Sequence, residues 1–133
     1  MIVADTNLIV HFLVQVVPTQ RAERVFNRDS QWSAPLLWRS EFRNVLTVYM
    51  RHGLLSLDEA LEVMQRAEIL MQGREYEIPS TAVLRLAAGS RCSAYDCEFV
   101  ALAQNLGVSM VTADRKVLSE FPATAVSVDA FSA

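Results

Sequence analysis

Apolar and polar positions divide this chain into short apolar runs and longer stretches with helical spacing. The first apolar run ends at Ala4 and leads directly into Asp5. A short apolar run bounded by polar residues is typical of a strand that is buried on both faces. Four later runs have the same character, and the strands that they predict cover residues 31–34, 76–78, 108–112 and 125–128.

The segments between these strands carry the signals that begin and end helices. Pro35 suits the start of a helix over residues 36–51, and Gly53 is placed to end it. Ser56 and Glu59 form a capping box that opens a helix running to about residue 72. The other predicted helices cover 6–14 (ended by residues 16–18), 20–28 (capped by Thr19), 81–88 (capped by Ser80), 94–106 (between Ser93 and Gly107) and 114–120, and a tail of small residues follows residue 128.

Apolar spacing also predicts which face of each long helix is buried. In the helix after Ser56, one stripe at three- and four-residue steps is expected to point inward, and it consists of Leu57, Leu61, Met64, Ala67 and Met71. Val63, Ile69 and Leu70 fall outside that stripe. In the preceding helix one face is expected to be buried, and it consists of Leu37, Glu41, Val45 and Val48.

Strands that alternate with helices predict a parallel sheet covered on both faces. The expected fold is a three-layer α/β/α domain with a central, mostly parallel sheet of four to five strands. The two long helices on either side of Gly53 form a helical hairpin that departs from strict alternation. A length of 133 residues favours one domain spanning 1–133.

Composition narrows the class of protein without defining its function. The apolar fraction of 52% fits a well-buried globular domain. The longest apolar stretch, residues 8–17, is interrupted by His11 and Gln15 and is shorter than the roughly 20 residues of a membrane span. It also lacks the basic segment of a secretory signal, so a cytoplasmic protein is expected. Cys92 and Cys97 have neither zinc-knuckle spacing nor a nearby histidine, which favours reduced thiols over zinc chemistry.

Net charge is a weak guide to the partner. The formal charge is −3, from 12 basic and 15 acidic residues, and taken alone this disfavours nucleic acid. If four of the acids bind cations, however, the basic residues outnumber the acids that remain. A local basic rim is therefore the feature to look for.

Four acidic residues stand where an α/β domain places its site. Asp5 and Asp114 each follow a buried strand, and ligands bind outside the carboxyl ends of the strands in open α/β sheets. Glu41 and Asp96 lie on apolar helix faces. Each acid also has an ordinary explanation, because the three aspartates can cap helices and Glu41 can pair with a buried arginine. Since all four are expected at one edge of one sheet, we favour a shared site.

A shared site for four carboxylates requires compensation of their charge. Two carboxylates about 4 Å apart repel by ~4 kcal/mol at an effective dielectric of roughly 20. Four of them stay ionised only beside a cation and otherwise take up protons. Oxygen ligands suit the hard ions Mg²⁺ and Mn²⁺ and disfavour zinc and copper. Thr112 and Asn44 are placed to hydrogen-bond neighbouring carboxylates.

Four motifs follow one another in the chain: Val-Ala-Asp-Thr-Asn at 3–7, Ser-Glu-Phe-Arg-Asn-Val-Leu at 40–46, Tyr-Asp-Cys-Glu-Phe-Val-Ala-Leu-Ala at 95–103 and Val-Thr-Ala-Asp at 111–114. Their order and spacing resemble those of the PIN-domain ribonucleases, and most closely the toxin half of VapBC-type toxin–antitoxin pairs. The resemblance implies a PIN-like fold and an acidic quartet of Asp5, Glu41, Asp96 and Asp114. The supporting polar positions are Asn7 and Thr112, to which we add Thr6 and Asn44. Glu98 is a fifth acid close to Asp96.

The activity implied by this resemblance is hydrolysis of RNA phosphodiesters with one or two Mg²⁺ or Mn²⁺ ions, leaving 5′-phosphate and 3′-hydroxyl ends. Asp5 and Asp96 are the first choice for direct metal ligands, while Glu41 and Asp114 bind either directly or through water. Basic residues that flank the acids are the expected phosphate contacts, with solvated surface charge as the alternative for each. They are Arg39, Arg43, Arg115 and Lys116.

The resemblance also implies three partners: RNA, a VapB-type antitoxin and a second copy of the chain in a homodimer. The antitoxin is expected to fill a groove lined by the apolar segments 8–17 and 57–71 and to reach the acids. Two other interpretations stay open: a PIN-fold nuclease of RNA processing outside a toxin pair, and a PIN-like binding or scaffold module with little activity. A phosphotransfer receiver is disfavoured, because a phospho-acceptor Asp on a middle strand and a late Lys do not occur in the required order.

Overall fold

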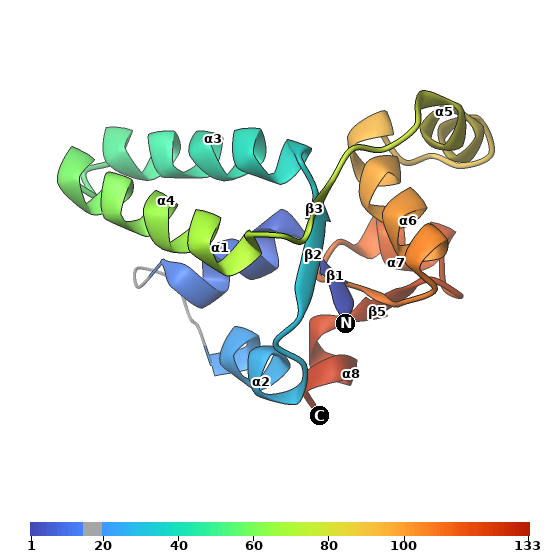
Figure 1. Cartoon of the computed structure of the whole chain (residues 1–133), viewed down its shortest axis with the longest axis horizontal. Coiled ribbons are helices and arrows are strands. Elements are labelled where there is room, and N and C mark those ends of the chain that lie inside the picture. Colours follow the sequence, from blue (N-terminus) through green and yellow to red (C-terminus); the bar gives the residue numbers. More distant parts are fainter. Residues whose placement is uncertain (15–19) are drawn as a thin grey trace.

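Five parallel strands form the centre of the molecule (Figure 1). The computed structural model describes residues 1–14 and 20–133, so the predicted end of the first helix at 16–18 and the cap at Thr19 lie outside the described residues. The strands are β1 (Ile2–Ala4), β2 (Trp32–Pro35), β3 (Glu75–Tyr76), β4 (Met110–Thr112) and β5 (Ala125–Ser127), in the order β3-β2-β1-β4-β5. In register, Val3 of β1 pairs with Ser33 of β2 on one side and Met110 of β4 on the other.

Helices cover both faces of this sheet, which confirms the three-layer α/β/α architecture. They are α1 (Thr6–Leu13), α2 (Gln20–Arg28), α3 (Leu37–Arg51), α4 (Leu57–Met71), α5 (Ser80–Ala88), α6 (Ala94–Leu106), α7 (Arg115–Glu120) and α8 (Val128–Ser132). Figure 1 shows α1 and the α3–α4 hairpin on one side of the strands, and α6 with α5 and α7 on the other. In the described part of the chain, none of the helices combines the length and the apolar character needed to cross a membrane.

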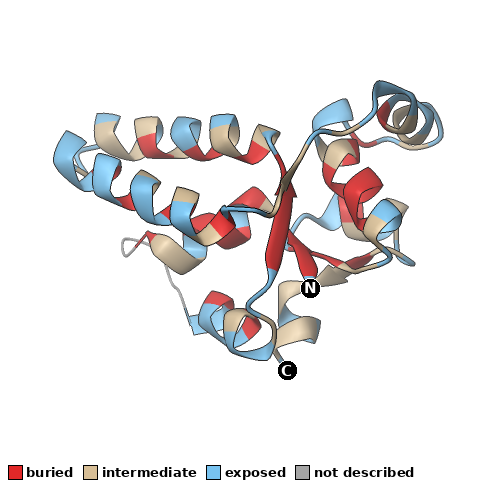
Figure 2. Ribbon diagram, viewed as in Figure 1, coloured by how far each residue is buried: buried red, intermediate tan, exposed pale blue. Residues whose placement is uncertain are grey.

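The core forms where short buried strands meet the inner faces of the helices (Figure 2). Every residue of β1, β2 and β4 is buried, as continuous apolar runs predict for a sheet covered on both faces. On one face, the rings of Phe12 and Phe26 stack 4.5 Å apart and both pack against Trp32, which ties α1 and α2 to β2. On the other face lies α6, which is buried from Phe99 to Ala103.

The helix signals in the sequence operate as expected at three places. Ser56 and Glu59 exchange both hydrogen bonds of the capping box at the start of α4. Ser93 caps α6 by accepting the Asp96 N–H at 3.1 Å. Gly107 ends α6 at a φ of 67°, a left-handed conformation that favours glycine. The start of α6, and with it the position of Asp96, is therefore fixed by local sequence.

The predicted inward stripe of α4 is wrong in part: Ala67 and Met71 are buried as predicted, but the two leucines are not. The buried residues are Ala60, Val63, Ala67 and Met71, whereas Leu57 and Leu61 are 62% and 60% exposed. Two alanines on the inner face let the helix lie close to α1 and β2, with which it is in contact, and this turns the leucines toward solvent. A partly apolar outer face of α4 is the result.

The predicted buried face of α3 is also wrong. Trp38, Phe42 and Leu46 are buried, with the Trp38 and Phe42 rings edge to face at 5.7 Å. These larger side chains occupy the core because they bury more apolar area than the predicted face would. Val48, on the face that includes Glu41, is 39% exposed. Glu41 therefore lies at the border of the core and not inside it.

Two further expectations fail at the ends of elements. Helix α5 begins at Ser80 itself, with Pro79 in the cap position and without a side-chain cap. The residues after Ser127 form α8 instead of a tail, because Ser127 caps this helix by accepting the Ala130 N–H at 3.0 Å. Arg28 then holds α8 against α2: its guanidinium donates to the Phe131 carbonyl at 3.0 Å and lies 5.2 Å from the Phe131 ring centroid.

Candidate functional site

Strands β1 and β4 bring Asp5 and Asp114 to the same edge of the sheet. The strands are parallel neighbours, and the Asp5 N–H donates to the Val111 carbonyl at 3.2 Å. Both aspartates cap helices, as one of the ordinary explanations predicts. Asp5 Oδ1 accepts the Thr6 N–H at 2.8 Å, and Asp114 Oδ1 accepts the Lys116 N–H, also at 2.8 Å. Capping therefore uses only one of the two oxygens of each carboxylate.

Two buried threonines connect the acids to one another. The Thr112 hydroxyl donates to Asp5 Oδ2 at 2.6 Å and accepts the Asp114 N–H at 3.0 Å. The Thr6 hydroxyl donates to Glu41 Oε1 at 2.7 Å, which links α1 to α3. The expectation that Thr112 hydrogen-bonds a carboxylate is thus confirmed. Because Thr6 is 4% and Thr112 0% exposed, these bonds hold the carboxylates in fixed orientations.

Asp96 joins the group from the opposite layer. It lies in the first turn of α6, a helix that packs on β1, β2 and β4. Its charge opposes ionisation of both Asp5 and Glu41, and the Asp114 charge in turn opposes ionisation of Asp96. All four acids from separate parts of the sequence therefore lie within electrostatic reach at the carboxyl edge of the sheet.

Burial is the main reason that three of these acids hold protons more tightly than usual. It raises the pKa of Asp5, although hydrogen bonds from Thr112 and Thr6 oppose the rise and the charges of Asp96 and Asp114 add to it. Burial likewise raises the pKa of Glu41 and of Asp96. For Asp96 the next contribution is repulsion by Asp114, while the Lys116 ammonium acts in the opposite direction.

The alternative of a buried ion pair does not describe this cluster. Among the described residues, none of the salt bridges within 4.0 Å includes Asp5, Glu41, Asp96 or Asp114. Arg39, a possible partner of Glu41, donates to both oxygens of Glu75, with its Nη2 atom 2.7 Å from Oε1. Within the described residues, the negative charge of the cluster is therefore offset only in part, by the Lys116 ammonium near Asp96.

The donor set fits a hard cation, although the four carboxylates do not converge tightly on one position. Carboxylate and hydroxyl oxygens are the donors that Mg²⁺ and Mn²⁺ prefer. Within the described ranges, no three acidic, histidine or cysteine side chains are arranged closely enough to form a ready-made metal site. Binding of an ion thus requires the carboxylates to move closer together around it. The metal affinity then depends on how firmly the helices and strands that carry the carboxylates are held in place.

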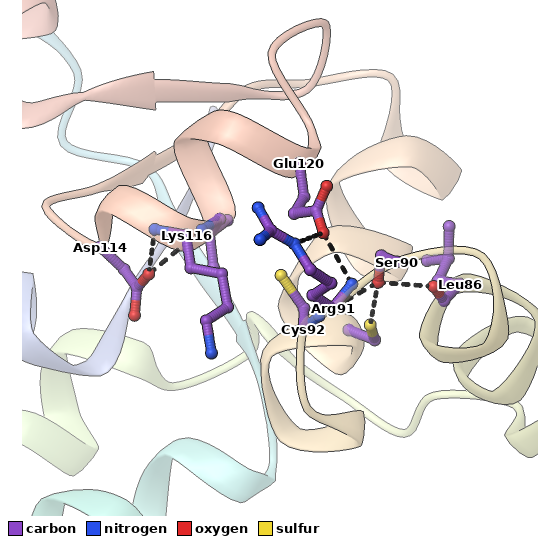
Figure 3. A network of polar contacts seen from close by, with 9 residues as sticks. Leu86, Ser90, Arg91, Cys92, Asp114, Lys116 and Glu120 are labelled. Atoms are coloured by element: carbon purple, nitrogen blue, oxygen red, sulfur yellow. Dashed lines mark hydrogen bonds and ion pairs between the residues drawn. The ribbon is translucent and has the colours of Figure 1, made fainter.

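The basic candidates differ in how free their side chains are. Arg43 on α3 and Arg115 and Lys116 on α7 are exposed. Figure 3 shows Asp114 and Lys116 extending from the same end of α7. Arg39, by contrast, is engaged with Glu75 and Glu68, the latter at 3.2 Å. The two asparagines, Asn7 on α1 and Asn44 on α3, are exposed.

The sequence left one feature open and did not reveal another. Glu98, the fifth acid, lies close enough to Glu41 for its charge to contribute to the raised Glu41 pKa, after burial and the charges of Asp5 and Asp96. Glu120 of α7 binds Arg91, which precedes α6, through both the backbone and the side chain (Figure 3). A contact between residues 29 apart leaves no local pattern in the sequence.

Fold and site together define an α/β/α domain with an acidic cluster at the carboxyl ends of parallel strands. Residues 2–123 match the family model of the PIN domain, and the chain belongs to this family. It is 29% identical over 125 residues to Ribonuclease VapC3 of Pyrobaculum aerophilum, covering 92% of this chain and 95% of that protein.

Solved structures share the fold. PAE2754 from Pyrobaculum aerophilum superposes with a TM-score of 0.76 at 20% identity, covering 99% of this chain and 96% of that one. FitAcB from Neisseria gonorrhoeae gives a TM-score of 0.74 at 17% identity, covering 96% of this chain and 98% of that one. FitAB bound to the IR36 DNA fragment gives 0.71 at 17% identity, with 96% and 95% covered. The family and the architecture agree with the resemblance seen in the motifs.

Proposed function

We propose that this protein is a metal-dependent endoribonuclease whose acidic quartet, Asp5, Glu41, Asp96 and Asp114, binds Mg²⁺ or Mn²⁺. The observation that carries the proposal is a group of carboxylates, three of them with raised pKa values, none of which forms a salt bridge with another described residue. A 29% identical relative named as a ribonuclease supports the choice of RNA as substrate.

In this proposal each residue has a definite task. Asp5 and Asp96 bind the ion directly, and Glu41 and Asp114 complete the site directly or through water. When bound, the metal ion lowers the pKa of a water molecule and neutralises charge on the phosphate. Thr112 and Thr6 keep Asp5 and Glu41 turned toward the site through bonds of 2.6 and 2.7 Å.

The proposed reaction is hydrolysis at phosphorus. The oxygen of water forms a bond to phosphorus and the bond to the 3′ oxygen breaks, which leaves a 5′-phosphate and a 3′-hydroxyl. The proton lost by the attacking water balances the proton gained by the 3′ oxygen. Exposed cations beside the acids, namely Arg43, Arg115 and Lys116, hold the phosphates of the RNA. Arg39 is left out of this set because its guanidinium is engaged with Glu75 and Glu68.

The decisive experiment is RNA cleavage by metal-stripped protein with Mg²⁺ or Mn²⁺ added back. Structured RNA should remain intact in chelator, and cleavage should appear on addition of either ion. Asp5→Asn, purified alongside, should remain inactive at every metal concentration. Cleavage that is equally fast in chelator, or equally fast in Asp5→Asn, would remove metal-assisted hydrolysis as the function.

We also propose that the chain is the toxin of a toxin–antitoxin pair, with a VapB-type antitoxin and a homodimer as its assemblies. The name of the VapC3 relative supports the first part of this proposal. The exposed apolar side chains on α4, where Leu57, Leu61 and Ile69 are at least 60% exposed, support coverage by a partner segment. A nuclease of RNA processing would need no such partner.

Controlled expression separates these two roles. Expression of the chain alone should arrest growth, and co-expression of the product of a neighbouring short reading frame should restore it. Asp5→Asn should not arrest growth in either case. Unimpaired growth on expression of active wild-type protein would favour the RNA-processing role over the toxin role.

A further inference from the structure

The loop between α5 and α6, residues 89–93, is anchored to both of its flanking helices (Figure 3). The Ser90 hydroxyl donates to the Leu86 carbonyl at 2.8 Å and accepts the Cys92 N–H at 3.3 Å. Ser90 Oγ also lies 4.0 Å from Cys97 Sγ, in the first turns of α6. These contacts fix the loop from the α5 side.

Glu120, the last residue of α7, fixes the same loop from the other side. Its Oε1 accepts the backbone N–H of Arg91 at 2.7 Å and the Arg91 Nε–H at 3.0 Å. The Glu120 side chain is only 21% exposed, whereas that of Arg91 is 78% exposed. Because an exposed ion pair contributes little, the bond to the loop backbone is the more important of the two.

Helix α7 therefore has a contact of functional interest at each end. Asp114 caps its first turn, and Glu120 at its last turn binds the loop that leads into α6. That loop ends at Ser93, which caps α6, and Asp96 lies in the first turn of this helix. Asp114 is thus linked to Asp96 through a frame that consists of α7, Glu120, Arg91 and the start of α6.

We propose that Glu120 is a positioning residue, which holds the loop before α6 against α7 and thereby fixes Asp96 relative to Asp114 for metal binding. The inference rests on the proposed function, because the two aspartates are taken as members of one metal site. Asp114 and Asp96 stand at the starts of two different helices, and two like-charged carboxylates repel each other. A frame that resists this repulsion lowers the cost of closing them around an ion. Groups that orient metal ligands from outside typically change metal affinity by about 10–100-fold.

The direct test is calorimetric titration of metal-stripped protein with Mn²⁺. Glu120→Ala should bind Mn²⁺ about tenfold more weakly than wild type. In RNA cleavage the half-saturating Mn²⁺ concentration should rise by the same factor, while the maximal rate at saturating Mn²⁺ stays within about twofold. Glu62→Ala is the matched control, because Glu62 forms an exposed ion pair with Arg66 on α4 and its loss removes the same charge. This control should bind Mn²⁺ as wild type does.

A conservative pair of variants separates positioning from simple charge. Glu120→Gln keeps an oxygen that can accept the Arg91 N–H but removes the charge, so it should bind Mn²⁺ within about twofold of wild type. Glu120→Asp keeps the charge but is one methylene shorter, so it should lose the loop and bind about as weakly as Glu120→Ala. This comparison also decides the matter if Glu120→Ala does not fold.

Each outcome has a definite meaning. If the Mn²⁺ affinity decreases in the order wild type, Glu120→Gln, Glu120→Asp, the result supports a positioning role of Glu120. If Glu120→Asp binds Mn²⁺ as wild type does and Glu120→Gln binds it weakly, Glu120 acts through its charge and the inference is overturned. Equal affinity in all variants overturns it as well. A wild-type protein that neither binds Mn²⁺ nor cleaves RNA overturns the proposed function, and this inference with it.

Discussion

Helix α3 contributes to two regions in which carboxylates are stabilised in opposite ways: one around Glu75 of β3 and one around its own Glu41. Two residues before Glu41, Arg39 donates to both oxygens of Glu75, and the Trp38 indole N–H donates to the same carboxylate at 2.8 Å. These bonds, chiefly that of Arg39, hold the pKa of Glu75 below its ordinary value. Around Glu41, by contrast, the hydrogen bonds come from neutral threonines, and the pKa values of Asp5, Glu41 and Asp96 are raised.

The difference distinguishes a structural ion pair from a site. Glu75 finds its counter-charge within the chain, so its region is neutralised when the protein folds. Among the described residues the quartet forms no salt bridge, and the Lys116 ammonium only partly offsets its charge, so it remains an attractive position for a cation from solution. The parallel strands β1, β3 and β4 all end at the same edge of the sheet. Location at this edge therefore does not by itself create a site.

The largest expected effect comes from removing one charge of the quartet. Asp5→Asn or Asp96→Asn should reduce metal-dependent RNA cleavage by at least about 100-fold, the scale on which an active site loses one prearranged charged group. Because repulsion is relieved, the melting temperature in chelator should stay the same or rise. Initial cleavage rates and thermal melting of the same preparations check both parts. A variant that is inactive only because it has unfolded would contradict the second part.

The Arg39 region should respond to the loss of its cation in the reverse manner. Arg39→Met leaves Glu75, whose side chain is 12% exposed, without its main partner. We expect a loss of about 2 kcal/mol in the free energy of unfolding, below the roughly 3–5 kcal/mol of a fully buried pair because Arg39 is itself partly exposed. Urea unfolding in chelator measures the loss, with Arg43→Met, an exposed arginine one turn further along α3, as the control. Equal stability of the two variants would mean that water solvates the Glu75 carboxylate well enough to replace the Arg39 guanidinium.

A smaller effect is expected at the basic rim. Lys116→Ala, placed in the inactive Asp5→Asn background so that RNA stays intact, should weaken binding to all RNA sequences alike. The slope of log affinity against log salt concentration should become shallower by about 0.7, the value for one phosphate contact on a single strand. Fluorescence anisotropy over a series of salt concentrations gives this slope. Arg51→Ala, at the far end of α3, has the same charge change and should leave it unaltered.

The smallest effect is the pH dependence of the metal-free protein. Since folding raises the pKa values of Asp5, Glu41 and Asp96, the folded state binds more protons than the unfolded state between the ordinary and the raised values. Stability must therefore fall as pH rises through that interval and increase as pH drops from neutrality toward about 4.5. Glu75, with its lowered pKa, contributes stability that is lost only at still lower pH. Melting curves in chelator should show this increase in stability on acidification. Saturating Mn²⁺ should stabilise the protein at neutral pH, so that the stability no longer increases as the pH drops.

Much of the fold was predictable because its signals are local. Cap residues and the glycines that end helices act within one turn, so the start of α4 at Ser56 and of α6 at Ser93 followed from the sequence. Continuous apolar runs likewise predicted β1 and β4, since strands buried on both faces need no alternation. The ends of strands were less well predicted, and β3 stops at Tyr76 instead of residue 78.

The orientation of the amphipathic helices was not predictable in the same way. On α4, leucines are more apolar than alanines, yet the alanines face the core because a neighbouring helix and strand lie close to them. On α3, Trp38 and Phe42 displaced the face that carries Glu41. In both cases the packing partner, which is distant in sequence, decided which side of the helix became buried.

The sequence by itself determined the candidates for the chemistry of this protein: four acids, each at the end of a strand or on a helix near that edge, in motifs of the PIN-domain type. Only the tertiary structure decided which carboxylate each of Thr6 and Thr112 would orient, that Arg39 would turn to Glu75, and that Glu120 would close the loop before α6. Helix caps and apolar runs depend on neighbours along the chain. Hydrogen bonds between residues 29 to 107 positions apart depend on how the layers pack, which no local pattern records.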